Sequence, residues 1–354
     1  MQRRLVMKAF ETLEDHLQTA VTEGNIAFPA AVCIRSITVA TRKISKHLAL
    51  GPLAGGLPSA TPNELATDHQ KVLNAIAGNL IVESLRKTPL AFLALKDRQE
   101  PIAIKSNAYL SMAVDPLEGG SNLKANAAAG TIFSIYSSEA LTGSTPGGIF
   151  LQKGTRQIAA GYCIYGIRTV LVLTIGSGTH IFTLEPDLDR YFLTTANVNI
   201  TAVTRKLAID IPEICQRDPA DCSQINNCLV AEAGLQGHNY DVHRVRSLVA
   251  ECHRILSRGG IILYPGNRRE DNKRGRMSLL YGGKPIALLI EQAAGRAISG
   301  KQRILDIKPE RLNQRIPMIA GSSRGIRCAD RFDKDHQLSG EYSQLFSHRG
   351  LFRA

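Results

Sequence analysis

Residues 111–136 carry the pattern from which the rest of the chain can be interpreted. They read Ser-Met-Ala-Val-Asp-Pro-Leu-Glu-Gly-Gly-Ser-Asn (111–122), Leu-Lys-Ala-Asn-Ala-Ala-Ala (123–129) and Gly-Thr-Ile-Phe-Ser-Ile-Tyr (130–136). Two apolar runs of strand type flank a turn that holds two carboxylates, Asp115 and Glu118. This spacing predicts two buried strands joined by a segment that carries acidic side chains.

The turn itself combines groups that bind anions with groups that bind cations. Pro116 fixes one backbone angle, and Gly119 and Gly120 allow the backbone to approach a ligand closely. Backbone N–H groups at such a turn can bind a phosphate, and carboxylates beside them can hold a divalent cation. Metal-assisted phosphoryl transfer needs both kinds of site side by side. The plainer alternative is a solvated turn between two strands.

Length and composition indicate an ordinary globular protein. The chain has 354 residues, 44% of them hydrophobic and 21% charged, which fits two fused subdomains better than one simple core. No apolar run approaches a membrane span, and the N-terminus lacks a signal-peptide apolar region, so we expect a cytoplasmic protein that does not bind membranes.

The basic character of the chain points to anionic ligands. The formal net charge is +12, with one dense basic cluster at 268–276. Nucleic-acid binding is not expected, because tryptophan is absent and no aromatic residues alternate with the basic ones. A solvated loop, or a loop that contacts sugar phosphates, is the preferred interpretation of the cluster.

The cysteines do not indicate a metal site or a disulfide framework. There are seven, an odd number, with no CxxC pair. Cys215, Cys222 and Cys228 cluster, but their spacing does not match a common zinc site. We therefore expect reduced, partly buried thiols.

Hydrophobic periodicity predicts a helical start followed by alternating strands. Helices are expected around 13–17 and over 30–48, 70–85, 244–256 and 286–295, and strands over 90–95, within 100–175 and over 260–264. Residues 185–190 are interpreted as a linker. The expected organisation is an N-terminal subdomain (1–188), a C-terminal subdomain (189–330) and a polar tail (331–354).

Several segments together resemble one family. Asp115 to Asn122 agrees at six of eight places with D-P-L-D-G-S-S-N of the class 1 fructose-1,6-bisphosphatases, and 130–136 is identical to their G-T-I-F-S-I-Y. Further similar segments follow in the same order at 160–166, 247–254, 258–265, 291–295 and 304–309. The resemblance covers about residues 10 to 325.

The resemblance implies an α/β protein with a layered α/β/α/β/α sugar-phosphatase fold of two fused subdomains. It also implies a homotetramer that uses Mg²⁺, with Mn²⁺ as the alternative, and hydrolyses the 1-phosphate of fructose 1,6-bisphosphate, in gluconeogenesis or the Calvin cycle. The N-terminal half is expected to supply the metal site, and the C-terminal half most sugar contacts.

Carried over position by position, the resemblance assigns three groups of site residues. Asp97 and Asp115 are the expected catalytic acids. The expected metal ligands are Asp115, the Leu117 carbonyl and Glu118. The expected substrate contacts are Glu118, Gly119, Gly120, Ser121, Tyr264 and Arg276.

Five positions depart from the family pattern at the expected metal site. Lys96 stands where the family has a metal-binding glutamate, Gly282 replaces another, and Asn74 and Asn79 each replace an aspartate. Glu118 is one methylene longer than the family's aspartate. Mg²⁺ needs anionic oxygen ligands, so a lysine at position 96 exchanges attraction for repulsion.

Three hypotheses follow from this pattern. The chain is a working fructose-1,6-bisphosphatase with a weakened metal site, or a non-catalytic paralogue that binds sugar phosphate and assembles with an active subunit. The third is a chain that is losing both fold and function. Losses concentrated at one site suit the second hypothesis better than the third.

Overall fold

The structure is a computed structural model that describes residues 10–54, 65–138, 145–209, 241–245, 247–264, 275–300 and 302–326. The cysteine cluster at 215–228, most of the basic cluster and the polar tail lie outside these ranges. In the ranges that are described, no helix has the length and apolar character needed to cross a membrane.

The N-terminal half is a helical layer on a mixed sheet. The helices are α2 (Leu13–Thr22), α3 (Phe28–Leu50) and α4 (Leu65–Leu85), with a short turn η1 (Gly51–Ala54). The strands are β1 (Leu90–Leu95), β2 (Ile102–Ala103), β3 (Leu110–Glu118), β4 (Ala129–Ser137), β5 (Gln157–Tyr165), β6 (Val170–Thr174), β7 (His180–Glu185) and β8 (Arg190–Thr195). Their order in the eight-stranded sheet is β2-β1-β3-β4-β5-β6-β7-β8, and among these described strands β1 and β3 are the one parallel pair.

Short helical turns connect these strands in the described residues. They are η2 (Gly120–Ala125), which follows β3, and η4 (Gly148–Phe150) and η5 (Gly154–Arg156), which precede β5.

The C-terminal half builds a second, five-stranded sheet with the order β10-β9-β11-β15-β13. Its elements are β9 (Lys206–Ile209), β10 (Asp241–Arg244), α6 (Leu248–Arg258), β11 (Ile261–Tyr264), α7 (Lys284–Gln292), β13 (Arg296–Ile298), η8 (Ile304–Asp306) and β15 (Met318–Gly321). A two-stranded pair, β12 (Met277–Ser278) with β14 (Arg315–Ile316), leads into the π-helical turn η7 (Leu279–Gly283).

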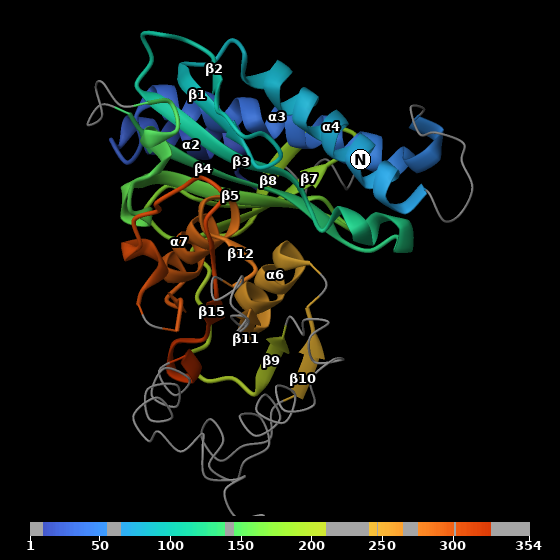
Figure 1. Cartoon of the computed structure of the whole chain (residues 1–354), viewed down its shortest axis with the longest axis vertical. Coiled ribbons are helices and arrows are strands. Elements are labelled where there is room, and N and C mark those ends of the chain that lie inside the picture. The colour runs from blue at the N-terminus through green and yellow to red at the C-terminus, as the bar shows by residue number, and fades with distance from the viewer. Residues whose placement is uncertain are drawn as a thin grey trace, which may run out of the picture.

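The elements stack in layers, as Figure 1 shows. Helices α2, α3 and α4 cover one face of the large sheet, and α6 and α7 lie between that sheet and the smaller one. The expected mixed α/β architecture, with a large central sheet flanked by helices, is confirmed.

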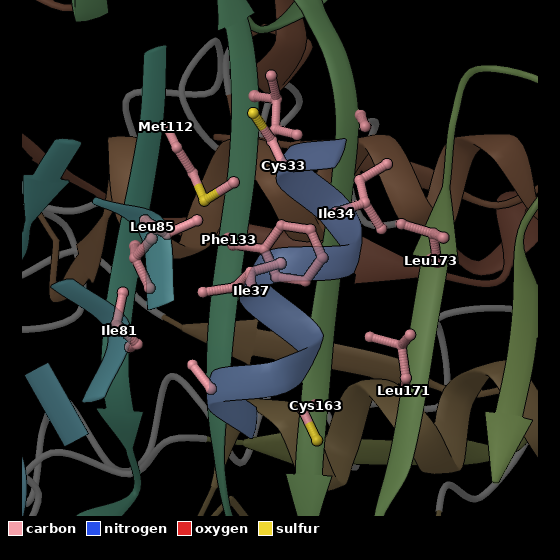
Figure 2. Packing of buried hydrophobic residues seen from close by; sticks show 14 of the residues in the cluster. Cys33, Ile34, Ile37, Ile81, Leu85, Met112, Phe133, Cys163, Leu171 and Leu173 are labelled. Atoms are coloured by element: carbon pink, nitrogen blue, oxygen red, sulfur yellow. The ribbon is translucent and has the colours of Figure 1, made fainter. Parts of the chain in front are cut away.

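Burial on both faces explains the apolar character of the central strands. Successive residues of β4 point to opposite faces, so Phe133 packs with the N-terminal helices and Ile132 packs with α6 and α7. In Figure 2, Cys33, Ile34 and Ile37 of α3 lie over Phe133 and its neighbours on the sheet. With cover on both faces, β3 and β4 are each buried at every position but the last.

Two local expectations differ from the structure. The segment interpreted as a linker, 185–190, is the turn of the antiparallel hairpin of β7 and β8 inside the large sheet. The predicted helix over 244–256 begins only at Leu248, because Ser247 caps its N-terminus with its side chain. The division of the chain at residue 188 falls inside this hairpin and stays a prediction. The expected thiols are seen as free, buried side chains at Cys33, Cys163 and Cys252.

A fully buried lysine begins helix α7. Lys284 is 0% exposed, its Nζ donates to the backbone carbonyl of Gln152, and it lies 5.9 Å from the centre of the Tyr136 ring. Burial lowers the pKa of the Lys284 ammonium to about 7. The folded protein therefore holds this side chain largely without charge above neutral pH.

This shift predicts a pH-dependent stability. Between pH 7 and the ordinary lysine pKa of 10.5, the unfolded chain binds more protons at Lys284 than the folded chain. The free energy of unfolding should therefore rise with pH there, by up to about 1.4 kcal/mol per unit. We expect Lys284→Met to remove this slope and to stabilise the protein at pH 7, as measured by urea unfolding at pH 7, 8 and 9. Exposed Lys105→Met is the control, and identical slopes for Lys284→Met and wild type would contradict the prediction.

Candidate active site

The site lies where β1 ends beside its parallel neighbour β3, which continues to Glu118. Leu95, the last residue of β1, pairs with Val114, and the Lys96 N–H donates to the Val114 carbonyl at 3.0 Å. The next residue of β3 is Asp115, so the register places Lys96 and Asp97 beside that carboxylate. The carboxyl ends of parallel strands are a common place for ligand sites in α/β proteins.

An irregularity in β3 separates the two acidic residues of the turn. Asp115 pairs with Ile132 and Glu118 with Gly130, and the register shifts between them. The Pro116 carbonyl in this bulge accepts a hydrogen bond from the Thr131 hydroxyl at 2.7 Å. A bulge changes the direction in which neighbouring side chains point. The side chains of Asp115 and Glu118 therefore lie in different surroundings.

Asp115 is paired with the side chain of Lys96. Lys96 Nζ lies 2.6 Å from Asp115 Oδ2, and the aspartate side chain is only 6% exposed. Burial alone lowers the pKa of the Lys96 ammonium, but three neighbouring carboxylates, chiefly that of Asp115, raise it overall. Burial raises the pKa of the Asp115 carboxyl, and Lys96 and the Leu117 N–H offset that shift in part.

Asp97 receives a hydrogen bond from helix α4. Asn74 Nδ2 donates to Asp97 Oδ2 at 3.2 Å. The amide oxygen of Asn74 is buried without a hydrogen-bond partner among the described residues, close to Gly120 of the turn. Asn74, the amide that replaces a family aspartate, thus donates a hydrogen bond to Asp97, the expected catalytic acid, and adds no negative charge to the site.

Glu118 is bound to the N-terminus of helix α6. One carboxylate oxygen accepts from the Leu248 N–H at 2.9 Å, and the other accepts from the Ser247 hydroxyl at 2.9 Å and the Val249 N–H at 3.3 Å. An anion is stabilised there because the first N–H groups of a helix lack internal partners. Burial raises the pKa of Glu118, and the Leu248 N–H is the main group that opposes this shift.

The glycine turn follows directly and begins η2. Gly119 has a left-handed backbone (φ 69°), and a Cβ there would lie 3.2 Å from the Ser247 hydroxyl oxygen. Gly120 has room for a side chain, since its nearest neighbour would be 3.4 Å from a Cβ. Ser121 is exposed beside it. Of the two glycines, Gly119 therefore has the stronger requirement for a residue without a side chain.

Tyr281 is a neighbour of the site that sequence analysis did not single out. It lies in η7, which packs against β3, and its hydroxyl has no hydrogen-bond partner in the described part of the chain. Burial raises its pKa, and the charges of Asp115 and Asp97 raise it further. The next residue, Gly282, has Met277 Sδ 2.8 Å from where a Cβ would stand. The only signal in the sequence was its place between Arg276 and Gly282, two positions at which the chain was compared with the family.

The remaining predicted substrate contacts lie in the C-terminal half. Tyr264 is buried at the end of β11, and Arg276 is exposed just before β12. Each has an interaction partner, so neither side chain is free. Since β12 continues into η7, Arg276 is linked to the site through a short stretch of chain.

The side chains of the site do not fit a divalent metal as they stand. No three His, Cys, Asp or Glu side chains gather to hold an ion within the described ranges. Lys96 pairs with Asp115, α6 takes both oxygens of Glu118, and position 282 has no side chain. Mg²⁺ needs oxygen ligands whose lone pairs are available, and this arrangement offers few.

Comparisons with known proteins agree with the resemblance across both halves. The family model described as "Fructose-1-6-bisphosphatase, N-terminal domain" matches residues 12–196, and "Fructose-1-6-bisphosphatase, C-terminal domain" matches residues 211–334. A class 1 fructose-1,6-bisphosphatase of Xanthobacter autotrophicus is 36% identical over 322 residues, covering 91% of this chain and 86% of the relative. One from Methylorubrum extorquens is 35% identical over 343 residues, covering 97% and 98%.

The fold agrees with that of solved structures. The holo form of Leishmania major fructose-1,6-bisphosphatase has a TM-score of 0.80 at 26% identity and covers 92% of this chain and 99% of that one.

The contacts of Glu118 predict a structural role that can be measured. Glu118→Ala removes the acceptor of three hydrogen bonds at the start of α6, so we expect the free energy of unfolding to fall by about 1–3 kcal/mol. Denaturant unfolding followed by circular dichroism measures this loss. Glu100→Ala, at an exposed position before β2, is the matched control; equal stability of the two variants would show that the contacts contribute nothing.

Proposed function

The chain belongs to the fructose-1,6-bisphosphatase family, and from this premise we propose that it is itself a fructose-1,6-bisphosphatase. It would hydrolyse the 1-phosphate of fructose 1,6-bisphosphate to fructose 6-phosphate and phosphate. The observation that carries the proposal is the end of β3 with the turn after it: Asp115 of β3 stands beside Asp97, and Gly119 begins the turn with a left-handed backbone.

The proposed roles follow from the chemistry of the side chains. Water adds to phosphorus as the bond to the sugar oxygen breaks; Asp97 accepts a proton from the water, and the sugar oxygen takes one from solvent. Asp115 holds Lys96 in place, which leaves an ammonium near the reacting phosphate.

The substrate contacts proposed for the rest of the site are polar and cationic. The backbone of Gly119, Gly120 and Ser121 would bind phosphate, together with the Tyr264 hydroxyl and the Arg276 guanidinium. Glu118 shapes this surface through α6, which contacts Gly119. An arginine suits the task because its planar guanidinium can bind two phosphate oxygens at once.

The family is metal-dependent, but the metal of this chain stays a prediction. Mg²⁺, or Mn²⁺ in its place, was expected on Asp115, the Leu117 carbonyl and Glu118, and those side chains do not fit it in their present contacts. The roles proposed above therefore pass through no metal. The homotetramer, the cytoplasmic location and the placement in gluconeogenesis or the Calvin cycle likewise stay predictions.

Phosphate release from fructose 1,6-bisphosphate tests the proposal. The wild-type protein is assayed with and without Mg²⁺ or Mn²⁺, beside Asp115→Asn and the control Asp306→Asn, an exposed aspartate far along the chain. We expect turnover by wild type and Asp306→Asn and at least a tenfold lower kcat for Asp115→Asn. Absence of turnover in folded protein that the substrate still protects against heat would contradict the proposal and support the non-catalytic alternative.

A further inference from the structure

Each carboxylate at the end of β1 and β3 already has a donor that the chain itself supplies. Asp115 has the Lys96 ammonium at 2.6 Å, Asp97 has the Asn74 amide at 3.2 Å, and Glu118 has the N-terminus of α6. These donors come from three separate elements, so the arrangement does not depend on one side chain. Carboxylates of this kind are the ligands that a divalent cation would otherwise use.

Lys96 differs from the other two donors because it brings a full positive charge. Its side chain is 40% exposed, whereas that of Asp115 is 6% exposed. The ammonium thus covers the buried carboxylate on its accessible side. A divalent cation approaching Asp115 would meet a like charge at contact distance, which is repulsive at any protein dielectric.

The same ammonium is available to an anion from solvent. An ammonium has three N–H donors, and one of them is directed at Asp115. Lysine acts toward phosphate as a point charge, so it can stabilise a phosphate without the bidentate geometry that arginine provides.

We infer that Lys96 is a tethered cation that takes the place of a divalent metal ion on Asp115 and receives the phosphate of the substrate in its stead. The identity of that substrate rests on the proposed function. The replacement of the metal does not, because it concerns only the contacts of Lys96 and Asp115 within this chain.

Direct Mn²⁺ binding, followed by the electron paramagnetic resonance signal of free Mn²⁺, tests the replacement without any assay of turnover. The full chain is compared as wild type, Lys96→Glu, Lys96→Ala and the surface control Lys105→Glu. We expect wild type and Lys105→Glu to bind Mn²⁺ equally weakly and Lys96→Glu to bind at least tenfold more tightly, with the gain lost in Lys96→Glu/Asp115→Asn. Thermal melts identify any variant that does not fold, and Lys96→Ala, with a smaller gain, serves if Lys96→Glu fails.

Two results would overturn the inference. One is that wild type binds Mn²⁺ as tightly as Lys96→Glu does and that this binding depends on Asp115. The other is a folded Lys96→Glu and Lys96→Ala pair with no gain in affinity.

The phosphate role is measured by calorimetric titration of fructose 1,6-bisphosphate in the presence of a chelator. We expect wild type and Lys105→Ala to bind it and Lys96→Ala to bind at least tenfold more weakly; equal affinities would overturn this part. Binding without turnover would reject the proposed function and leave the inference standing. Turnover together with tight Mn²⁺ binding on Asp115 would support the proposed function and overturn the inference.

Discussion

The parallel pairing of β1 with β3 is the constraint on which the site depends. Because Leu95 lies opposite Val114, the chain that leaves β1 must bring Lys96 against Asp115. Apolar side chains on both faces of the two strands hold this pairing. The geometry of the site is therefore set by the core and not by contacts among its polar groups. A shift of the register would separate the ion pair and expose core residues at the same time.

Glu118 links this site to the packing of the two halves. Its carboxylate belongs to the large sheet, and its three donors belong to the helix between the sheets. The sheet and the helix also approach closely at Gly130, where a Cβ would stand 2.7 Å from a methyl carbon of Val249. Glu118, which the family pattern assigns to metal and substrate binding, therefore also holds the two layers together. Changing it affects both the site and the packing of the layers.

The chain keeps the backbone of a metal-dependent phosphatase family while its polar side chains follow another arrangement. An ammonium, an amide and a helix N-terminus each satisfy one carboxylate. A divalent cation carries two charges and must be bound from solution, whereas a lysine carries one and is always present. The site therefore carries less positive charge than one that holds a divalent cation, but a chelator cannot remove its lysine.

The sequence by itself determined the family, the helical and strand segments of the core, and the position of Asp115 beside a glycine turn. These follow from local patterns: apolar periodicity, the motif at 115–122 and the identical segment at 130–136. Only the tertiary structure decided that Lys96 pairs with Asp115, that Glu118 binds α6, that Tyr281 borders the site and that 185–190 is a hairpin turn. Those contacts join residues that are distant in sequence or lie on different strands, and no local pattern encodes which partner a side chain meets once the layers have packed.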